Sequence, residues 1–248
     1  MIGRYPAAAA RLVAQWCREA NRRHNVLARH LKRRWARQRC MQVPPFDPAA
    51  HESILDYRDY HRYATIAMAL SRIEAEGIPG ALAEAGVYLG YASRFIHHLA
   101  PRRRYYLFDT FAGFHRDDLE AGVEDRRFRD TSLEAVLRTI GDTTNIEPRP
   151  GRVPETFAGL EQETFAFVLL DMDLHRPTLS ALAFFYPRLA PGGYLMVHDY
   201  HNPESNWGCK RAVDEFMADK PEGMVELADM WGSVVFRRAR PAPGAERA

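Results

Sequence analysis

The sequence predicts an α/β fold in which helices cover both faces of a mostly parallel sheet. From residue 81 onward, short apolar segments that suit β-strands alternate with longer segments that suit helices. The segment FAFVLL at 165–170 is apolar throughout, as expected of a strand buried on both faces of a parallel sheet. Gly86 and Gly90 follow the first of these segments, where a strand turns into a helix. Such alternation is typical of parallel strands joined by crossover helices.

The expected elements follow from apolar periodicity and from breaker residues. The first helix is expected at 59–77, because Ile66, Leu70 and Ile73 share one face and Gly77 ends it. Seven strands are expected, at 81–86, 103–109, 145–149, 165–173, 192–199, 224–230 and 233–238. Further helices are expected at 91–100, 131–141, 154–160, 177–189 and 208–219. The last two strands flank a tight turn, so we predict a hairpin that gives the sheet an antiparallel last strand.

The chain is predicted to have three parts: a basic helical extension with a linker at 1–58, the α/β domain at 59–240 and a flexible tail at 241–248. Residues 7–39 are interpreted as a basic helix or helix pair, because apolar residues recur there at helical spacing among many arginines. We expect this extension to pack on the domain or on a second copy of the chain, which would form a homo-oligomer. A weak contact with a membrane surface or an acidic partner, and disorder, are the alternatives.

The composition is that of an ordinary globular protein. The chain has 248 residues and a formal net charge of +2, which is too small to indicate nucleic-acid binding by itself. Its three cysteines are widely spaced, which argues against a disulfide framework or a zinc site and favours a reducing compartment. No apolar run approaches the roughly 20 residues that span a bilayer. A cytoplasmic location is therefore the expectation.

The ends of the first two strands offer a nucleotide-binding site. Ligands of an open α/β sheet bind beyond the carboxyl ends of its strands. Glu84, Gly86 and Gly90 lie at the first strand-to-helix turn, where glycines let a ligand approach the backbone, although the spacing is not GxGxxG. Asp109 ends the second strand roughly twenty residues later and suits the ribose hydroxyls of a nucleotide. Ordinary turn glycines and a solvated acid are the alternative interpretation.

Four polar residues follow the fourth and fifth strands. Asp171 and Asp173 come after FAFVLL, and His198 and Asp199 come after GYLMV. Because neighbouring parallel strands end at the same edge of a sheet, we expect these side chains to meet. Gathered carboxylates repel one another unless a cation lies among them, and oxygen ligands favour a hard cation such as Mg²⁺. Such a cation lowers the pKa of a bound hydroxyl, so that a nearby carboxylate can take the proton. The alternative is that these acids cap the helices that follow.

Longer motifs resemble the macrocin O-methyltransferase family, which includes sugar methyltransferases of the novobiocin and mycinamicin pathways. The motifs are RIEAEGIPGALAEAGVYLG, YYLFDTFAGF, FRDTSLEAVL, LLDMDLHRPTLSAL and YPRLAPGGYLMVHDY, followed by CKRAVDEF. They cover most of the chain from residue 59 to about residue 216, and the basic N-terminal helix lies outside the resemblance. The resemblance implies a Rossmann-like class I methyltransferase fold, S-adenosylmethionine as methyl donor, and Mg²⁺ or another divalent cation as helper.

The resemblance also implies roles for individual residues. Asp171, His198 and Asp199 would bind the metal, and Asp173 would be the general base. His198 stands where the sugar methyltransferases have an acid, so three roles stay open: it binds a metal, it acts as the base itself, or the site holds no metal. The residues implied in cofactor binding are Glu84, Gly86, Tyr88, Gly90, Ser93, Asp109, Thr110 and Phe111.

The predicted function is an S-adenosylmethionine-dependent O-methyltransferase that acts on a hydroxyl of a sugar or a glycosylated natural product. Its partners would be this small-molecule acceptor and the cofactor, and not nucleic acid. One alternative is a degenerate, non-catalytic domain that serves as a scaffold or a membrane-associated subunit. Others are a metal-independent O-methyltransferase of another small molecule and a nicotinamide-dependent oxidoreductase.

Overall fold

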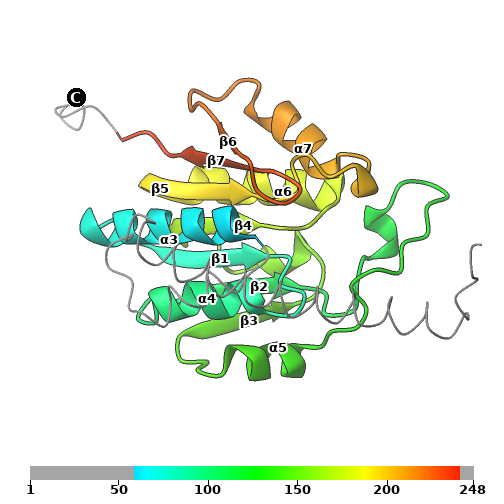
Figure 1. Ribbon diagram of the computed structural model, residues 1–248, viewed down its shortest axis with the longest axis horizontal. Coiled ribbons are helices and arrows are strands. Elements are labelled where there is room, and N and C mark those ends of the chain that lie inside the picture. Colours follow the sequence, from blue (N-terminus) through cyan, green and yellow to red (C-terminus); the bar gives the residue numbers. More distant parts are fainter. Residues whose placement is uncertain (1–58, 241–248) are drawn as a thin grey trace, which may run out of the picture. The chain divides into compact units, whose positions relative to one another are not determined.

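The computed structural model describes residues 59–240, and the predictions for the N-terminal extension at 1–58 and the tail at 241–248 lie outside the described residues. Within the described range, helices and strands alternate along the chain around a central sheet (Figure 1). This alternation confirms the predicted α/β fold class. Among the helices at residues 59–240, none combines the length and the apolar character that a bilayer span requires.

The sheet has seven strands in the order β3-β2-β1-β4-β5-β7-β6. Strands β1 to β5 pair in parallel, whereas β7 pairs antiparallel with both β5 and β6, as the predicted terminal hairpin requires. The first strand, β1, therefore lies near the middle of the sheet. The chain crosses from one edge back to the middle between β3 and β4, so β1 and β4 lie side by side. The strands are β1 (Ala81–Ala85), β2 (Tyr105–Asp109), β3 (Ile146–Pro150), β4 (Phe165–Leu170), β5 (Leu189–Val197), β6 (Val225–Leu227) and β7 (Ser233–Arg237).

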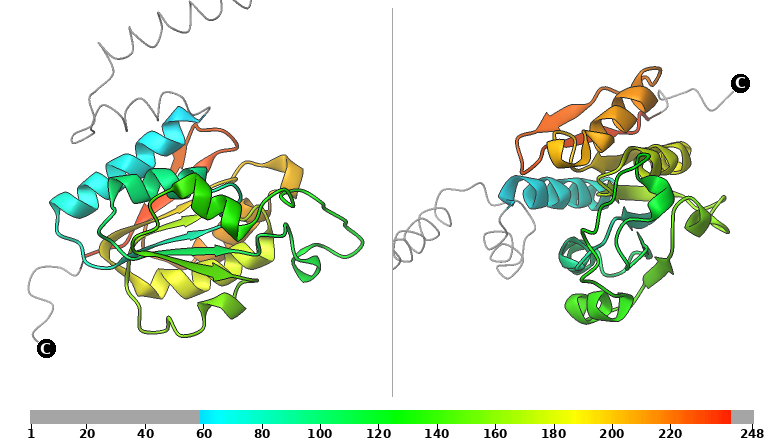
Figure 2. Two further views of the ribbon diagram at one scale, coloured as in Figure 1. Left: turned by 90° about the horizontal axis from the view of Figure 1, so that it is seen from below. Right: turned by 90° about the vertical axis from the view of Figure 1, so that its right-hand side faces the viewer.

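Helices form a layer on each face of the sheet. On one face, α3 (Tyr60–Ala75) packs beside α4 (Tyr91–Leu99), which in turn contacts α5 (Leu133–Ile140). On the other face, α6 (His175–Phe185) packs against α7 (Gly208–Met217), and the left view of Figure 2 shows the two layers edge on. Strand β4 lies between these layers, and all six of its residues are buried, as its apolar sequence predicts.

The helix predicted at 154–160 is wrong, because only a single 3₁₀ turn, Glu155–Phe157, forms there. Pro154 precedes this turn, and Gly159 follows it with a φ of +83°, a backbone conformation that ends a helix. The strand predicted at 165–173 stops at Leu170. This early end matters for the site, because Asp171 and Asp173 then lie beyond the sheet, where their side chains are not confined to alternate faces.

Candidate active site

A pocket of about 510 Å³ opens at the carboxyl ends of the parallel strands, within the size range of small-molecule sites. It is the place that open α/β sheets use for ligands, beyond the central strands where the chain crosses over. The structure places residues from both predicted sites around this one pocket. They are Glu84, Gly86, Tyr88, Asp109, Thr110, Asp171, Asp173, His198 and Asp199.

Gly86 lets the first strand-to-helix turn lie directly on the end of β4. Its φ is +90°, and a β-carbon built there would lie 1.9 Å from the backbone carbonyl oxygen of Asp171. No side chain fits in that space, so the turn can approach β4 only with glycine at this position. The sequence pattern predicted that a glycine here lets a ligand approach the backbone. In the structure, the glycine also lets the turn approach the end of β4.

Asp109 holds the same turn from the other side. Its Oδ2 accepts hydrogen bonds from the backbone N–H groups of Val87 at 2.7 Å and Tyr88 at 3.0 Å. Its Oδ1 accepts from the N–H of Phe111 at 2.7 Å. Both lone pairs of Oδ2 are thus used, whereas Oδ1 keeps one acceptor site, and Asp109 lines the pocket while it shapes the turn. The sequence predicted a contact of Asp109 with a nucleotide and gave no sign of its role in the turn.

Glu84 is a buried carboxyl, with 1% of its surface exposed. The Ser93 hydroxyl donates to its Oε2 at 2.6 Å, and the Tyr105 hydroxyl donates to the same oxygen. Burial raises the pKa of Glu84 to about 7, against the opposing effect of these two hydrogen bonds. Glu84 therefore borders the pocket as a group that exchanges a proton near neutral pH.

Three residues that the resemblance implied in cofactor binding lie outside the pocket lining. Gly90 is the N-cap of α4, with a φ of +78°. Ser93 is fully buried and reaches the site only through its hydrogen bond to Glu84. Phe111 is buried with a φ of +52°. These residues support the turn, whereas Tyr88 and Thr110 lie in the pocket wall.

Glu84 gives the stability of the protein a pH dependence that can be measured. Because its folded-state pKa is raised to about 7, the folded protein keeps a proton that the unfolded chain releases near pH 4.5. This contribution to stability is complete below about pH 4.5 and is lost as the pH rises through about 7. Glu84→Gln removes it, so the stability of the variant relative to the wild type should improve by up to about 3 kcal/mol between pH 4.5 and 8. Urea unfolding at both pH values tests this, with the exposed Glu124→Gln as control; a constant difference between Glu84→Gln and wild type would contradict it.

The four residues that follow β4 and β5 meet, as the topology predicts. His198 Nδ1 lies 3.1 Å from Asp171 Oδ1 and 3.4 Å from Asp199 Oδ1. Asp173 lies beside them and accepts a hydrogen bond from the Ser205 hydroxyl at 2.9 Å. Both Asp173 and Asp199 have positive φ values, of +60° and +59°, in a backbone conformation that few residues other than glycine adopt. The loops thus hold these side chains toward the pocket at the expense of backbone strain.

The carboxyl groups of this cluster differ in proton affinity. Burial raises the pKa of Asp173 to about 7, and the neighbouring Asp199 and Asp171 add to the effect. Burial opposes ionisation of Asp171 as well, but His198 and Arg62 outweigh it and hold the pKa of Asp171 well below its usual range. Two acids of one site are thereby separated into an ionised group and a group that titrates near neutral pH, which is the usual basis of acid–base assignment.

Three arginines line the pocket, Arg62, Arg127 and Arg152, and none of them was predicted from the sequence; the first two contact the acids of the site. Arg62, in the first turn of α3, donates from Nη1 to Asp171 Oδ2 at 3.0 Å. Arg127, in the long loop after β2, has its Nη1 3.6 Å from Asp173 Oδ1 and donates from Nη2 to Ser205 at 3.0 Å. No sequence signal separates them from the many surface arginines of this chain, because each depends on how its helix or loop packs over the strand ends.

The residues predicted as metal ligands come together, but their surroundings do not suit Mg²⁺. Ligand atoms of Asp171, His198 and Asp199 all lie within 4.8 Å of one another. Mg²⁺ demands near-octahedral oxygen ligands, whereas one of these three donors is a ring nitrogen that already contacts both carboxylates. The second oxygen of Asp171 is bonded to the Arg62 guanidinium. The donor set is therefore a poor fit for Mg²⁺, and no step of the reaction is assigned to that ion.

The sheet order, the antiparallel β7 and the pocket at the carboxyl edge define a class I methyltransferase fold. Macrocin-O-methyltransferase (TylF) is the family that matches residues 10–238, and the chain belongs to this family. The match begins at residue 10, so the prediction that the basic N-terminal segment lies outside the family resemblance is wrong for most of that segment.

Two related proteins and one solved structure show what the chain resembles. It is 28% identical over 197 residues to "8-demethyl-8-(2,3-dimethoxy-alpha-L-rhamnosyl)-tetracenomycin-C 4'-O-methyltransferase" of Streptomyces olivaceus, covering 68% of this chain and 74% of that protein. It is 28% identical over 160 residues to "Mycinamicin III 3''-O-methyltransferase" of Micromonospora griseorubida, covering 57% and 61%. The structure of the O-methyltransferase NovP superposes with a TM-score of 0.62 at 25% identity, over 73% of this chain and 81% of that one.

Proposed function

We propose that this protein transfers the methyl group of S-adenosylmethionine to a hydroxyl of a sugar or of a glycosylated small molecule. The observation that carries the proposal is that two groups of residues line one pocket. The β1–α4 turn suits the methyl donor, and the acids beyond β4 and β5 suit a hydroxyl acceptor. Membership of the macrocin O-methyltransferase family supports the donor and the reaction. The names of the relatives, one of which acts on a rhamnosyl group, support a sugar acceptor.

Asp173 is the proposed general base. Its pKa of about 7 leaves it partly ionised at neutral pH, and a base in that range works well for proton transfer. The acceptor oxygen gives its proton to Asp173 and forms a bond to the methyl carbon while the bond from that carbon to sulfur breaks. The products are the methyl ether, S-adenosylhomocysteine and protonated Asp173. Asn202, whose amide donates to Asp199 Oδ1 at 3.2 Å, lines the same pocket and keeps the neighbouring carboxylate in place.

The donor side of the pocket depends on Asp109. Asp109→Ala removes the acceptor oxygen that holds Val87 and Tyr88, together with the acceptor proposed for the ribose hydroxyls. We expect the dissociation constant for S-adenosylmethionine to rise by about 10- to 100-fold, the effect of losing one or two hydrogen bonds to a charged group. Isothermal titration measures it. An unchanged dissociation constant would show that the donor binds elsewhere, and Asp130→Asn, at an exposed acid that accepts from the Tyr88 hydroxyl, is the control.

The proposed reaction has a direct assay. The full-length protein is incubated with S-adenosylmethionine and with rhamnosylated or other glycosylated acceptors, each with free sugar hydroxyls. Mass spectrometry should find an acceptor whose mass increases by one methyl group, together with an equal amount of S-adenosylhomocysteine. Methylation of aglycone hydroxyls alone, with no transfer to any sugar, would contradict the assignment of the acceptor class while leaving the reaction type intact.

A further inference from the structure

Arg62 places a permanent positive charge among the acids of the site. Its side chain is 13% exposed, and Nη1 donates to Asp171 Oδ2 at 3.0 Å. A guanidinium stays protonated under all conditions that a folded protein experiences. The first turn of a helix disfavours a cation, because the free N–H groups there already carry partial positive charge. The position of Arg62 is therefore explained by its contact with Asp171 and not by the stability of α3.

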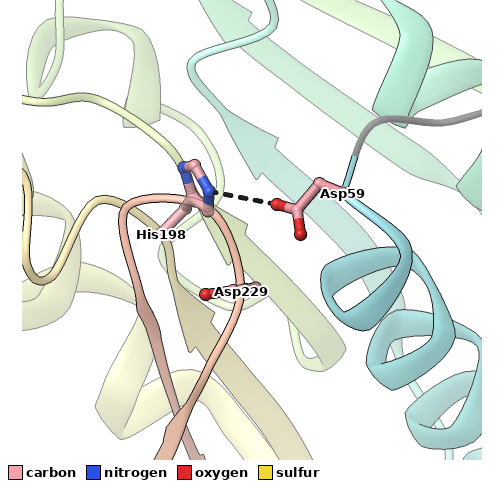
Figure 3. A group of neighbouring side chains, drawn as sticks. All are labelled: Asp59, His198 and Asp229. Atoms are coloured by element: carbon pink, nitrogen blue, oxygen red, sulfur yellow. Dashed lines mark ion pairs between the residues drawn. The ribbon is translucent and has the colours of Figure 1, made fainter.

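His198 supplies a second cation in the same place. Its Nδ1 faces Asp171 and Asp199, and its Nε2 faces Asp59 Oδ2 at 3.7 Å on the other side of the ring. Figure 3 shows this ring between the start of α3, which carries Asp59, and the loop between β6 and β7, which carries Asp229. An ionised carboxylate accepts but does not donate, so Nδ1, 3.1 Å from Asp171 Oδ1, has to carry a proton, while Asp59 faces Nε2 beyond hydrogen-bond distance. The surroundings thus favour the imidazolium form.

We infer that Arg62 and His198 provide, from within the protein, the positive charge that a divalent cation would bring to these carboxylates, and that the site works without such a cation. A metal at Asp171, His198 and Asp199 would need a lone pair on the ring nitrogen that points at the two acids. The proton on that nitrogen occupies the lone pair, and the Arg62 guanidinium holds one oxygen of Asp171, so both oppose metal binding. Both cations border the pocket, where negative charge develops on the acceptor oxygen as its proton leaves.

The cluster satisfies its acids without a metal. Asp171 receives hydrogen bonds on both oxygens, from Arg62 and from His198. Asp199 is bonded by the Asn202 amide and Asp173 by the Ser205 hydroxyl. Among the described residues, Asp171, Asp173 and Asp199 thus each accept at least one hydrogen bond from a side chain. A metal would have to displace these donors, whereas carboxylates without hydrogen-bond donors would bind a metal ion favourably.

Mn²⁺ binding tests the inference independently of any activity, because free Mn²⁺ has an electron paramagnetic resonance signal that is lost on binding. Wild-type protein, Arg62→Gln/His198→Asp and Asp171→Asn are titrated as full-length chains, and thermal unfolding first shows that each is folded. We expect the wild type to leave Mn²⁺ free up to concentrations of about 1 mM. The double variant, with an all-oxygen ligand set and no guanidinium, should bind at least about tenfold more tightly. If the double variant is unfolded, the single variants His198→Asp and Arg62→Gln take its place.

The outcomes separate cleanly. The inference is overturned if the wild type binds Mn²⁺ at concentrations well below about 1 mM and Asp171→Asn abolishes that binding. A folded double variant that binds no more Mn²⁺ than the wild type also overturns it, because the two cations would then not be what excludes the metal. Binding that Asp171→Asn leaves unchanged belongs to another site and counts as absence of binding at this one.

The claim that the site works without a metal rests on the proposed function and has its own measurement. Methyl transfer after exhaustive treatment with EDTA should equal that of untreated protein. A loss of transfer that Mg²⁺ restores would contradict the claim. Failure of the proposed function would appear differently, as absence of methyl transfer in every sample, and would leave the Mn²⁺ result standing.

Discussion

Asp173→Asn should lower turnover by about 10² to 10⁴-fold, the range expected when a general base is removed. The amide has the size of the carboxyl and keeps a hydrogen-bond partner for Ser205, which bonds Asp173 Oδ1 at 2.9 Å. Binding of S-adenosylmethionine should stay within a few-fold, because the donor side of the pocket lies at the ends of β1 and β2. The measurement is the single-turnover rate of methyl transfer at saturating donor and acceptor, since this rate excludes product release.

The matched control for Asp173→Asn is Glu204→Gln. Glu204 also lines the pocket and also lies 3.6 Å from Arg127, but its side chain is 58% exposed. The same loss of charge there should leave the rate of methyl transfer close to that of the wild type. If Asp173→Asn kept that rate too, proton removal would have to be assigned to a different group.

Gly86→Ala should destabilise the fold more than any other single methyl addition near the site. The new β-carbon would lie 1.9 Å from the carbonyl oxygen of Asp171 and 2.6 Å from its carbon, and a backbone cannot move aside as a flexible side chain can. With the added cost of a φ of +90°, we expect a loss of more than about 3 kcal/mol in the free energy of unfolding. Urea unfolding measures the loss, and titration should show that binding of S-adenosylmethionine falls with it.

Gly122→Ala and Gly159→Ala separate the steric clash from the cost of a positive φ. These glycines have φ values of +80° and +83°, and a β-carbon built on either meets nothing within 4 Å. They therefore carry the cost of the backbone conformation alone, about 1 to 2 kcal/mol. A loss in Gly86→Ala no larger than in these controls would show that the β1–α4 turn does not lie against β4 as described.

The strands and the meeting of Asp171, Asp173, His198 and Asp199 could be predicted because both follow from local patterns. An apolar run such as FAFVLL is stable at the centre of a sheet that helices cover on both faces. Neighbouring parallel strands have their carboxyl ends at the same edge of the sheet. The predicted helix at 154–160 failed for the opposite reason. Its composition permits a helix, but a proline and a glycine confine it to one 3₁₀ turn.

Arg62 could not be predicted, because its role depends on where α3 packs. Its sequence neighbourhood describes an ordinary amphipathic helix, and only the tertiary arrangement brings its guanidinium to Asp171, 109 positions later in the chain. The three backbone contacts of Asp109 depend on loop conformation in the same way. The four residues at the strand ends predict a metal site when they are considered alone, and the contact of Arg62 with Asp171 is the observation that favours a site without a metal.

The most direct test of the account is whether the pocket at the ends of β1, β4 and β5 binds a sulfonium donor. Isothermal titration of full-length protein with S-adenosylmethionine and, separately, with NAD compares the two nucleotide cofactors that this kind of sheet accommodates. We predict a single site for S-adenosylmethionine with a dissociation constant on the order of micromolar, weakened in Asp109→Ala, and no binding of NAD. Binding of NAD with no binding of S-adenosylmethionine would contradict the account.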